Sequence, residues 1–138
     1  MMENLETLIE NFAFFDCWED KYQYLIDLGE KLEKLPDSLK TDAFKVAGCQ
    51  SQVWLVPHFE DGLFSFQADS DAIMVKGIIS ILQTIYNQKS LGEIKGIEVE
   101  KIFAKLGLEE HLSPSRRNGM LSMVEKIRFY ADQFEKNV

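Results

Sequence analysis

Two β-rich runs joined by a two-residue turn limit most strongly what this chain can fold into. Residues 53–59 and 63–68 are rich in β-branched and aromatic side chains, and Asp61-Gly62 lies between them. An Asp-Gly pair between two such runs is a favoured hairpin turn, because both residues readily adopt positive φ angles. This turn places Phe59 opposite Phe64, so the predicted hairpin has one apolar face and one mixed face.

A long apolar stripe follows the hairpin. Residues 73–85 repeat apolar side chains at helical spacing, which is typical of a helix that packs against a sheet. Asp69 or Ser70 can cap the first turn of this helix. The hairpin register places Gln52 opposite Asp71, so we expect the segment just before Gln52 to lie beside the start of the helix.

The rest of the chain has mainly helical patterns. A short strand at residues 44–47 is a further candidate element, because apolar residues alternate there with other types. Helices are expected at residues 5–15, 16–35, 90–96, 99–107 and from 113 onward. The sequence therefore predicts an α+β fold with helices on one side of a small antiparallel sheet, which contains the hairpin and the candidate third strand. Residues 1–138 are expected to form a single domain.

The composition argues against several classes of function. A chain of 138 residues with 46% hydrophobic content can bury one core but is short for two domains. Its net charge of −8 argues against nucleic-acid binding, which depends on clustered Lys and Arg. No window holds the ~20 apolar residues that a membrane span needs, and the first residues do not resemble an export signal. We therefore expect a soluble, cytoplasmic protein.

Few residues are available for a metal centre or a disulfide. The chain has two cysteines, Cys17 and Cys49, and two histidines, His58 and His111, with no Cys-x-x-Cys pair. This is not metal-ligand spacing, so no metal site is expected. Both thiols are expected to stay reduced, because a protein without an export signal remains in a reducing compartment.

The segment from Val46 to Trp54 is the main candidate for chemistry. Cys49 follows Gly48, which offers backbone freedom, and precedes three residues that can donate hydrogen bonds: Gln50, Ser51 and Gln52. A nucleophilic thiolate needs nearby donors and a setting that can present the sulfur to a partner. The competing interpretation is that Cys49 is a small, inert core residue, which is the more common role of a free cysteine beside apolar residues.

The charges expected near Cys49 leave two questions open. The start of the helix after the hairpin favours a thiolate, whereas Asp69 and Asp71 oppose it, so the direction of the Cys49 pKa shift is undecided. Arg116 and Arg117 lie in the first turn of the last helix, where a cation is disfavoured. They are either solvated or paired with acids of this chain or of a partner.

Several segments form a pattern in chain order. They are Trp18–Tyr22 with Leu28-Gly29, Gly48–Trp54, Asp69–Ala72 through Gly77, His111–Arg116, and Asn118-Gly119. This pattern covers nearly the whole chain and resembles the SufE family of sulfur-acceptor proteins, which serve iron–sulfur cluster assembly.

The resemblance implies an α+β domain with Cys49 at the tip of a loop. Cys49 would receive sulfane sulfur from the persulfide of a PLP-dependent cysteine desulfurase of the SufS type, stimulate that enzyme, and pass the sulfur to a SufB-type scaffold. No cofactor is implied for this chain, because PLP belongs to the partner. Gly48, Gln50, Ser51 and Gln52 belong to the matching loop motif, and Asp71 and Arg116 match positions associated with contact to the desulfurase. Whether the chain forms a homodimer is left open.

The alternative is a thiol-dependent enzyme, a peroxidase or hydrolase, that uses Cys49. Such a site usually needs a base or a resolving thiol. The candidates are His58, His111 and Cys17, and the hairpin register turns His58 away from the Cys49 segment. A pure binding module with an inert Cys49 is the third hypothesis.

Overall fold

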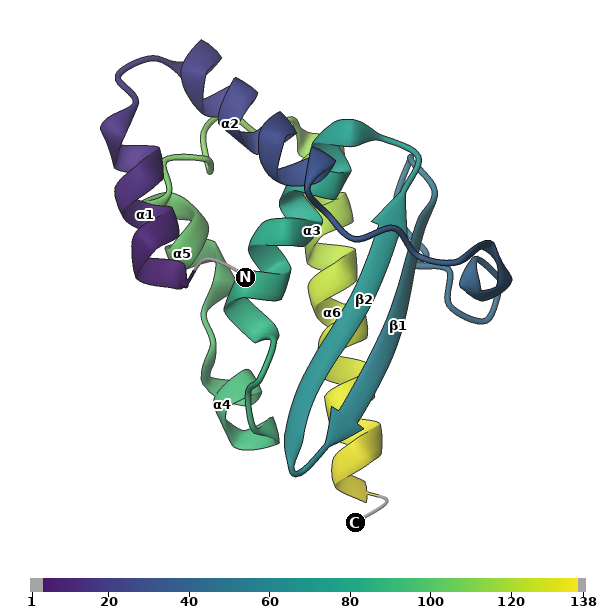
Figure 1. Ribbon diagram of the computed structural model, residues 1–138. Helices are drawn as coiled ribbons and strands as arrows, with labels where there is room; N and C mark the ends of the chain where they lie inside the picture. Colours follow the sequence, from purple (N-terminus) through teal and green to yellow (C-terminus); the bar gives the residue numbers. More distant parts are fainter. Residues whose placement is uncertain (1–3, 137–138) are drawn as a thin grey trace.

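Within residues 4–136, which a computed structural model describes, the chain forms a two-stranded hairpin with helices packed on one side of it (Figure 1). In chain order the elements are α1 (Leu5–Phe14), α2 (Trp18–Glu30), the 3-10 helix η1 (Asp37–Leu39), β1 (Val53–Glu60), β2 (Leu63–Ser70), α3 (Ile73–Tyr86), α4 (Leu91–Gly96), α5 (Val99–Lys105) and α6 (Pro114–Lys136). In this part of the chain, no helix is long and apolar enough to cross a membrane.

The hairpin has the predicted register. Strands β1 and β2 are antiparallel, and Phe59 lies opposite Phe64. Asp61 and Gly62 have φ angles of 56° and 76°, which are the positive values that a two-residue hairpin turn requires. The predicted apolar face packs on the helices behind it, and Phe64 on this face is fully buried. The α+β architecture with helices on one side of the sheet is therefore confirmed.

The candidate third strand is reduced to a single bridge. Lys45 pairs with Trp54, and the backbone N–H of Leu55 donates to the carbonyl of Phe44 at 2.9 Å. Turns at residues 41–44 and after residue 46 bound this segment, so too little extended backbone remains for a ladder. The sheet accordingly has the order β1-β2 only in the described residues.

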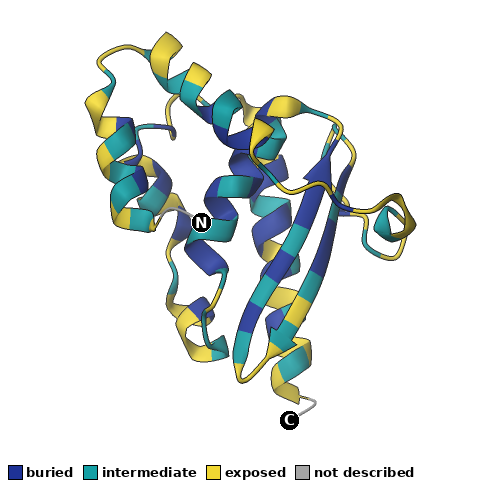
Figure 2. Cartoon of the chain, viewed as in Figure 1, coloured by how far each residue is buried: buried dark blue, intermediate teal, exposed yellow. Residues whose placement is uncertain are grey.

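Helix α3 is the centre of the fold, with α2 on one side and the hairpin on the other (Figure 1). Most of α3 is buried, as its dark colour in Figure 2 shows. Helices α2 and α3 approach closely at Gly29 and Gly77. A Cβ atom on Gly77 would lie 2.3 Å from the carbonyl oxygen of Leu25, so this contact accepts no larger residue without movement of the backbone.

Two helix starts differ from the prediction. Helix α2 begins at Trp18 with Cys17 as N-cap, so Asp16 lies outside it, and Cys17 makes no side-chain capping hydrogen bond. Helix α3 begins after Ala72, which is also a cap without a side-chain hydrogen bond. Asp69 and Ser70 do not cap α3, because both residues still belong to the β2 ladder.

Candidate functional site

Residues 47–52 form a loop, here called the Cys49 loop, which joins the short bridge segment to β1. At its base the N–H of Val46 donates to the carbonyl of Val53 at 2.8 Å. Its last residue, Gln52, is also tied to the segment just before α3. The N–H of Gln52 donates to Asp71 Oδ1 at 3.1 Å, and the N–H of Asp71 donates to the Gln52 carbonyl at 3.3 Å. The register argument therefore placed Gln52 and Asp71 correctly.

The loop lies against α6 at Gly48. This residue has a φ of 85°, which favours glycine, and a Cβ atom there would lie 2.6 Å from Ser122 Oγ. The sequence suggested Gly48 as a source of backbone freedom. In the folded chain it also lies close to α6, where a larger residue would require the Ser122 hydroxyl to move.

The Cys49 side chain is half-buried, and its thiol is free. Its S–H donates to the carbonyl of Gly119 on α6, with 3.6 Å between sulfur and oxygen. Burial raises the pKa of the Cys49 thiol above its usual value. This answers the question that the sequence left open: in the isolated chain, the resting sulfur is a neutral thiol near pH 7.

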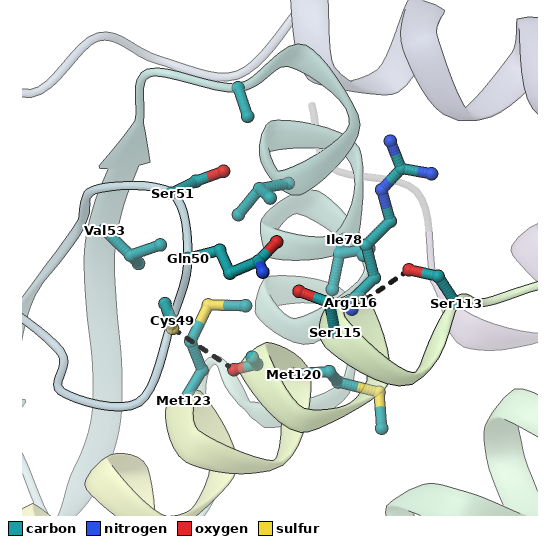
Figure 3. Close-up of a pocket in the computed structure, with 13 residues that line it drawn as sticks. Cys49, Gln50, Ser51, Val53, Ile78, Ser113, Ser115, Arg116, Met120 and Met123 are labelled. Carbon is teal, nitrogen blue, oxygen red and sulfur yellow. Dashed lines mark hydrogen bonds between the residues drawn. The ribbon is translucent and has the colours of Figure 1, made fainter.

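The Cys49 sulfur borders a cavity of about 290 Å³ (Figure 3). Apolar side chains from β1, α3 and α6 line it: Val53, Val75, Ile78, Met120 and Met123. Polar side chains from the Cys49 loop and the start of α6 complete the lining: Gln50, Ser51, Ser113, Ser115 and Arg116. The starts of two helices thus meet at one cavity, as the position of Ala72 in the same lining also indicates.

Arg116 and its neighbour Arg117 differ in their partners. Arg117 pairs with Glu100 and Glu109 at 3.5 and 3.8 Å. Arg116 is exposed and forms no ion pair with any residue between 4 and 136. In Figure 3 its guanidinium lies across the cavity from Cys49, with the Gln50 side chain between them in this view.

The structure divides the predicted site residues into two groups. Gln50, Ser51 and Arg116 line the cavity beside Cys49. Gly48, Gln52 and Asp71 shape and anchor the loop instead. The apolar cavity residues on α6, Met120 and Met123, were missed, because in the sequence they are only part of a helical stripe.

A buried carboxylate beside the loop anchor was also missed. Asp69 was expected as a possible cap of the helix after the hairpin, but it is buried and accepts hydrogen bonds from the N–H groups of Ser70 at 2.8 Å and Leu35 at 3.3 Å. Lys40 and Lys76 lie at 3.5 and 3.7 Å. Burial raises the pKa of Asp69, but the two N–H donors and two lysines outweigh it, so the pKa lies below its usual value. Asp69 therefore remains charged. It connects β2 to the segment that contains Leu35 and Lys40 and to Lys76 of α3, and it lies two residues before the loop anchor Asp71.

The residues needed for an independent thiol enzyme lie elsewhere. His58 Nε2 is 3.4 Å from Gln67 Oε1 on the outer face of the hairpin. The His111 ring stacks on Trp18 with 4.3 Å between centroids, and Cys17 is exposed at the start of α2. None of these three side chains lines the Cys49 cavity. Among residues 4–136 there is also no group of three or more His, Cys, Asp or Glu that could hold a metal ion.

Comparisons with known proteins agree on one family. The family described as "SufE: Fe-S metabolism associated domain" matches residues 6–131. An uncharacterized SufE-like protein of Rhizobium meliloti is 44% identical over 135 residues, which is 95% of this chain and 96% of that protein. A second one, from Rhizobium etli, is 44% identical over 131 residues and covers 92% of this chain and 88% of its own length.

The fold comparison is independent of close sequence similarity. The solution structure of a hypothetical protein from Thermus thermophilus matches with a TM-score of 0.75 at 19% sequence identity. The match covers 94% of this chain and 93% of the other. It supports the overall fold only.

Proposed function

The chain belongs to the SufE family, whose domain is associated with Fe–S metabolism, and we propose that Cys49 is its sulfur acceptor. In this proposal, Cys49 takes the terminal sulfur from the persulfide of a SufS-type cysteine desulfurase and passes it to a SufB-type cluster scaffold. PLP remains in the desulfurase. Removal of the persulfide sulfur frees that enzyme for another turnover, which would account for its stimulation. The exchange would take place in the cytoplasm, where thiols stay reduced.

The proposed reaction is a thiol–persulfide exchange. The Cys49 thiolate attacks the terminal sulfur of the desulfurase persulfide, a new S–S bond forms on Cys49, and the desulfurase cysteine leaves as a thiolate. The same step, with a scaffold thiolate as the attacking group, would unload Cys49. No group on this chain needs to act as a base once the Cys49 proton has been lost to water or to the partner.

The position of Cys49 is the observation that carries the proposal. Its loop is anchored at both ends, but among residues 4–136 the hydrogen bonding of the sulfur is limited to a weak S–H donor bond to the Gly119 carbonyl. A thiol with a raised pKa in a partly apolar setting is slow to react with stray partners. A desulfurase that draws Cys49 out of this setting would lower its pKa and expose it in a single movement, which suits a relay better than independent turnover.

Sulfur transfer to Cys49 can be tested directly by mass. The protein is mixed with a catalytic amount of a SufS-type desulfurase and excess cysteine, and intact mass spectrometry is used to look for one added sulfur atom. We expect this adduct in the wild type and in Cys17→Ser, the matched variant that keeps Cys49. We expect none in Cys49→Ser.

Two results would contradict the proposal. One is a wild-type protein that gains no sulfur although the desulfurase turns over. The other is an adduct that persists in Cys49→Ser, which would place the acceptor elsewhere. Loss of the adduct in Cys17→Ser would likewise move the chemistry away from the cavity.

A further inference from the structure

The cavity beside Cys49 is larger than a single carried sulfur atom needs. Its volume of about 290 Å³ is close to the lower end of the range for small-molecule sites, roughly 300–1,000 Å³. A persulfide on Cys49 adds only one atom to the side chain. The remaining space fits a small molecule of a few heavy atoms.

The lining defines the chemistry of such a molecule. The apolar part includes Met120 and Met123, whose thioethers are polarisable and suit contact with another sulfur atom. The polar part offers the hydroxyl of Ser115, the amide of Gln50 and the guanidinium of Arg116. Arg116 has no ion-pair partner within residues 4–136, so its charge is available to an anion. A guanidinium, a hydroxyl and an amide at the lining of one cavity are groups that can bind a carboxylate.

The sulfur and the guanidinium lie at different sides of the cavity lining. The nucleophilic sulfur of Cys49 borders the cavity at one side, and in Figure 3 the Arg116 guanidinium lies at the other. We propose that the cavity also admits small carboxylate-bearing persulfides, such as that of free cysteine, and that Cys49 takes sulfur from them without a protein donor. This inference rests on the proposed function only in taking Cys49 as a sulfur acceptor.

The transfer conserves atoms and electrons. The Cys49 thiolate attacks the terminal sulfur of the small persulfide, R–S–SH, and forms the Cys49 S–S bond. The S–S bond of the donor breaks, and R–S⁻ leaves and takes up a proton from water. One sulfane sulfur moves from one thiol to another, so no oxidant or reductant is needed.

A pair of matched donors tests the role of the carboxylate. The persulfide of 3-mercaptopropionate carries a carboxylate, whereas the persulfide of 2-mercaptoethanol is neutral and of similar length. Each is mixed with the Cys17→Ser protein over a range of concentrations, without desulfurase, and the rate of addition of one sulfur atom to Cys49 is followed by intact mass. Sulfide alone is the blank, because it cannot add sulfur to a reduced thiol without an oxidant.

We expect the carboxylate donor to load Cys49 with a rate that saturates, and to be preferred over the neutral donor. In Arg116→Gln this preference should fall by about three- to tenfold, the range for an exposed, charge-assisted contact. The neutral donor forms no ion pair with Arg116, so the substitution should slow it less than it slows the carboxylate donor. Arg117→Gln is the matched control: it removes the same charge one residue later, and the preference should remain.

The inference is overturned by any of three results. The carboxylate donor loads without saturation and without preference; the preference is the same in Arg116→Gln as in the parent; or the product is only the mixed disulfide of Cys49 with R–S. The desulfurase experiment, run in parallel, separates the two proposals. If the desulfurase loads Cys49 while small persulfides show no preference, only this inference fails. If neither donor loads Cys49, the proposed function fails as well.

Discussion

The buried carboxylate of Asp69 should contribute far more to stability than an exposed carboxylate that contacts the same lysine. Lys40 Nζ lies 3.5 Å from a carboxylate oxygen of Asp69 and 3.5 Å from one of Asp37. The Asp69 side chain is 4% exposed and that of Asp37 is 99% exposed. Asp69→Asn and Asp37→Asn therefore remove the same charge from the same lysine at the same distance, and differ in burial and in the further contacts that Asp69 makes.

The expected magnitude follows from the contacts that Asp69 makes. An asparagine keeps one acceptor oxygen, so one of the two N–H donors, Ser70 or Leu35, loses its partner inside the protein. A hydrogen bond to a charged group is worth about 1.5–3 kcal/mol, and the other one weakens when the charge is lost. Both lysines are 28% exposed and can reach water. We expect Asp69→Asn to lower the free energy of unfolding by about 2–4 kcal/mol.

Urea unfolding at pH 7, followed by tryptophan fluorescence, measures this effect. With a slope of about 2 kcal/mol per M, in the middle of the usual range for urea, the midpoint of Asp69→Asn should fall by about 1–2 M. Asp37→Asn should not shift measurably, because exposed pairs contribute little. The result that refutes the reasoning is a shift in Asp69→Asn no larger than that in Asp37→Asn.

The pH dependence supplies a second check. The folded-state pKa of Asp69 is lowered, so its contribution is present above the unfolded pKa of about 4 and is lost as the pH falls through the folded value. Wild type and Asp69→Asn should therefore converge in stability as the pH drops below about 4. A gap that stays constant down to about pH 2 would show that the loss comes from packing rather than from the charge.

Three further predictions concern packing, the loop anchor and the thiol. Gly77→Ala should lower the free energy of unfolding by about 2–3 kcal/mol, because its Cβ would meet the backbone of α2. Gly92→Ala is the control: its Cβ has open space within α4, so the free energy of unfolding should stay the same or rise slightly, and urea midpoints compare the two variants. Asp71→Ala should speed alkylation of Cys49 by about fivefold with little change in the urea midpoint, because it removes the side-chain bond to Gln52 and leaves only the backbone bond at that end of the loop; an unchanged rate would mean that the side-chain bond does not restrain the loop. In a Cys17→Ser background, the alkylation rate of Cys49 should rise with pH around a midpoint above the ~8.5 of a free cysteine, because burial raises the pKa of this thiol. A midpoint near pH 7 would contradict the neutral resting thiol.

The hairpin shows how much of the fold was readable in advance. Its turn, register and apolar face all follow from Asp61-Gly62 and the alternation of side chains on either side. The placement of Gln52 opposite Asp71 came from the same register and located one end of the Cys49 loop. The turn is a local feature, and the pairing of the strands follows from it residue by residue. Both can therefore be predicted from one sequence.

The candidate third strand and the cap of α3 show where local reasoning failed. The alternation around Lys45 is present, but turns on both sides leave room for one bridge only. Asp69 has the side chain of a good N-cap, yet the β2 ladder runs past it and Lys40 and Lys76 close around it. In both places, contacts between distant segments outweighed the local preference.

By itself, the sequence determined the hairpin, most of the helices, and the choice of Cys49 with Gly48 beside it as the candidate for chemistry, because turn chemistry, periodicity and motif spacing are properties of neighbouring residues. Only the tertiary structure decided the state of that sulfur. Helix α6 supplies Gly119, Met120 and Met123 to the surroundings of Cys49. Gly119, which accepts the S–H hydrogen bond, is 70 residues after Cys49 in the chain. The pKa of a thiol depends on the groups that surround it in space and on how far they exclude water, and no pattern of adjacent residues specifies that arrangement.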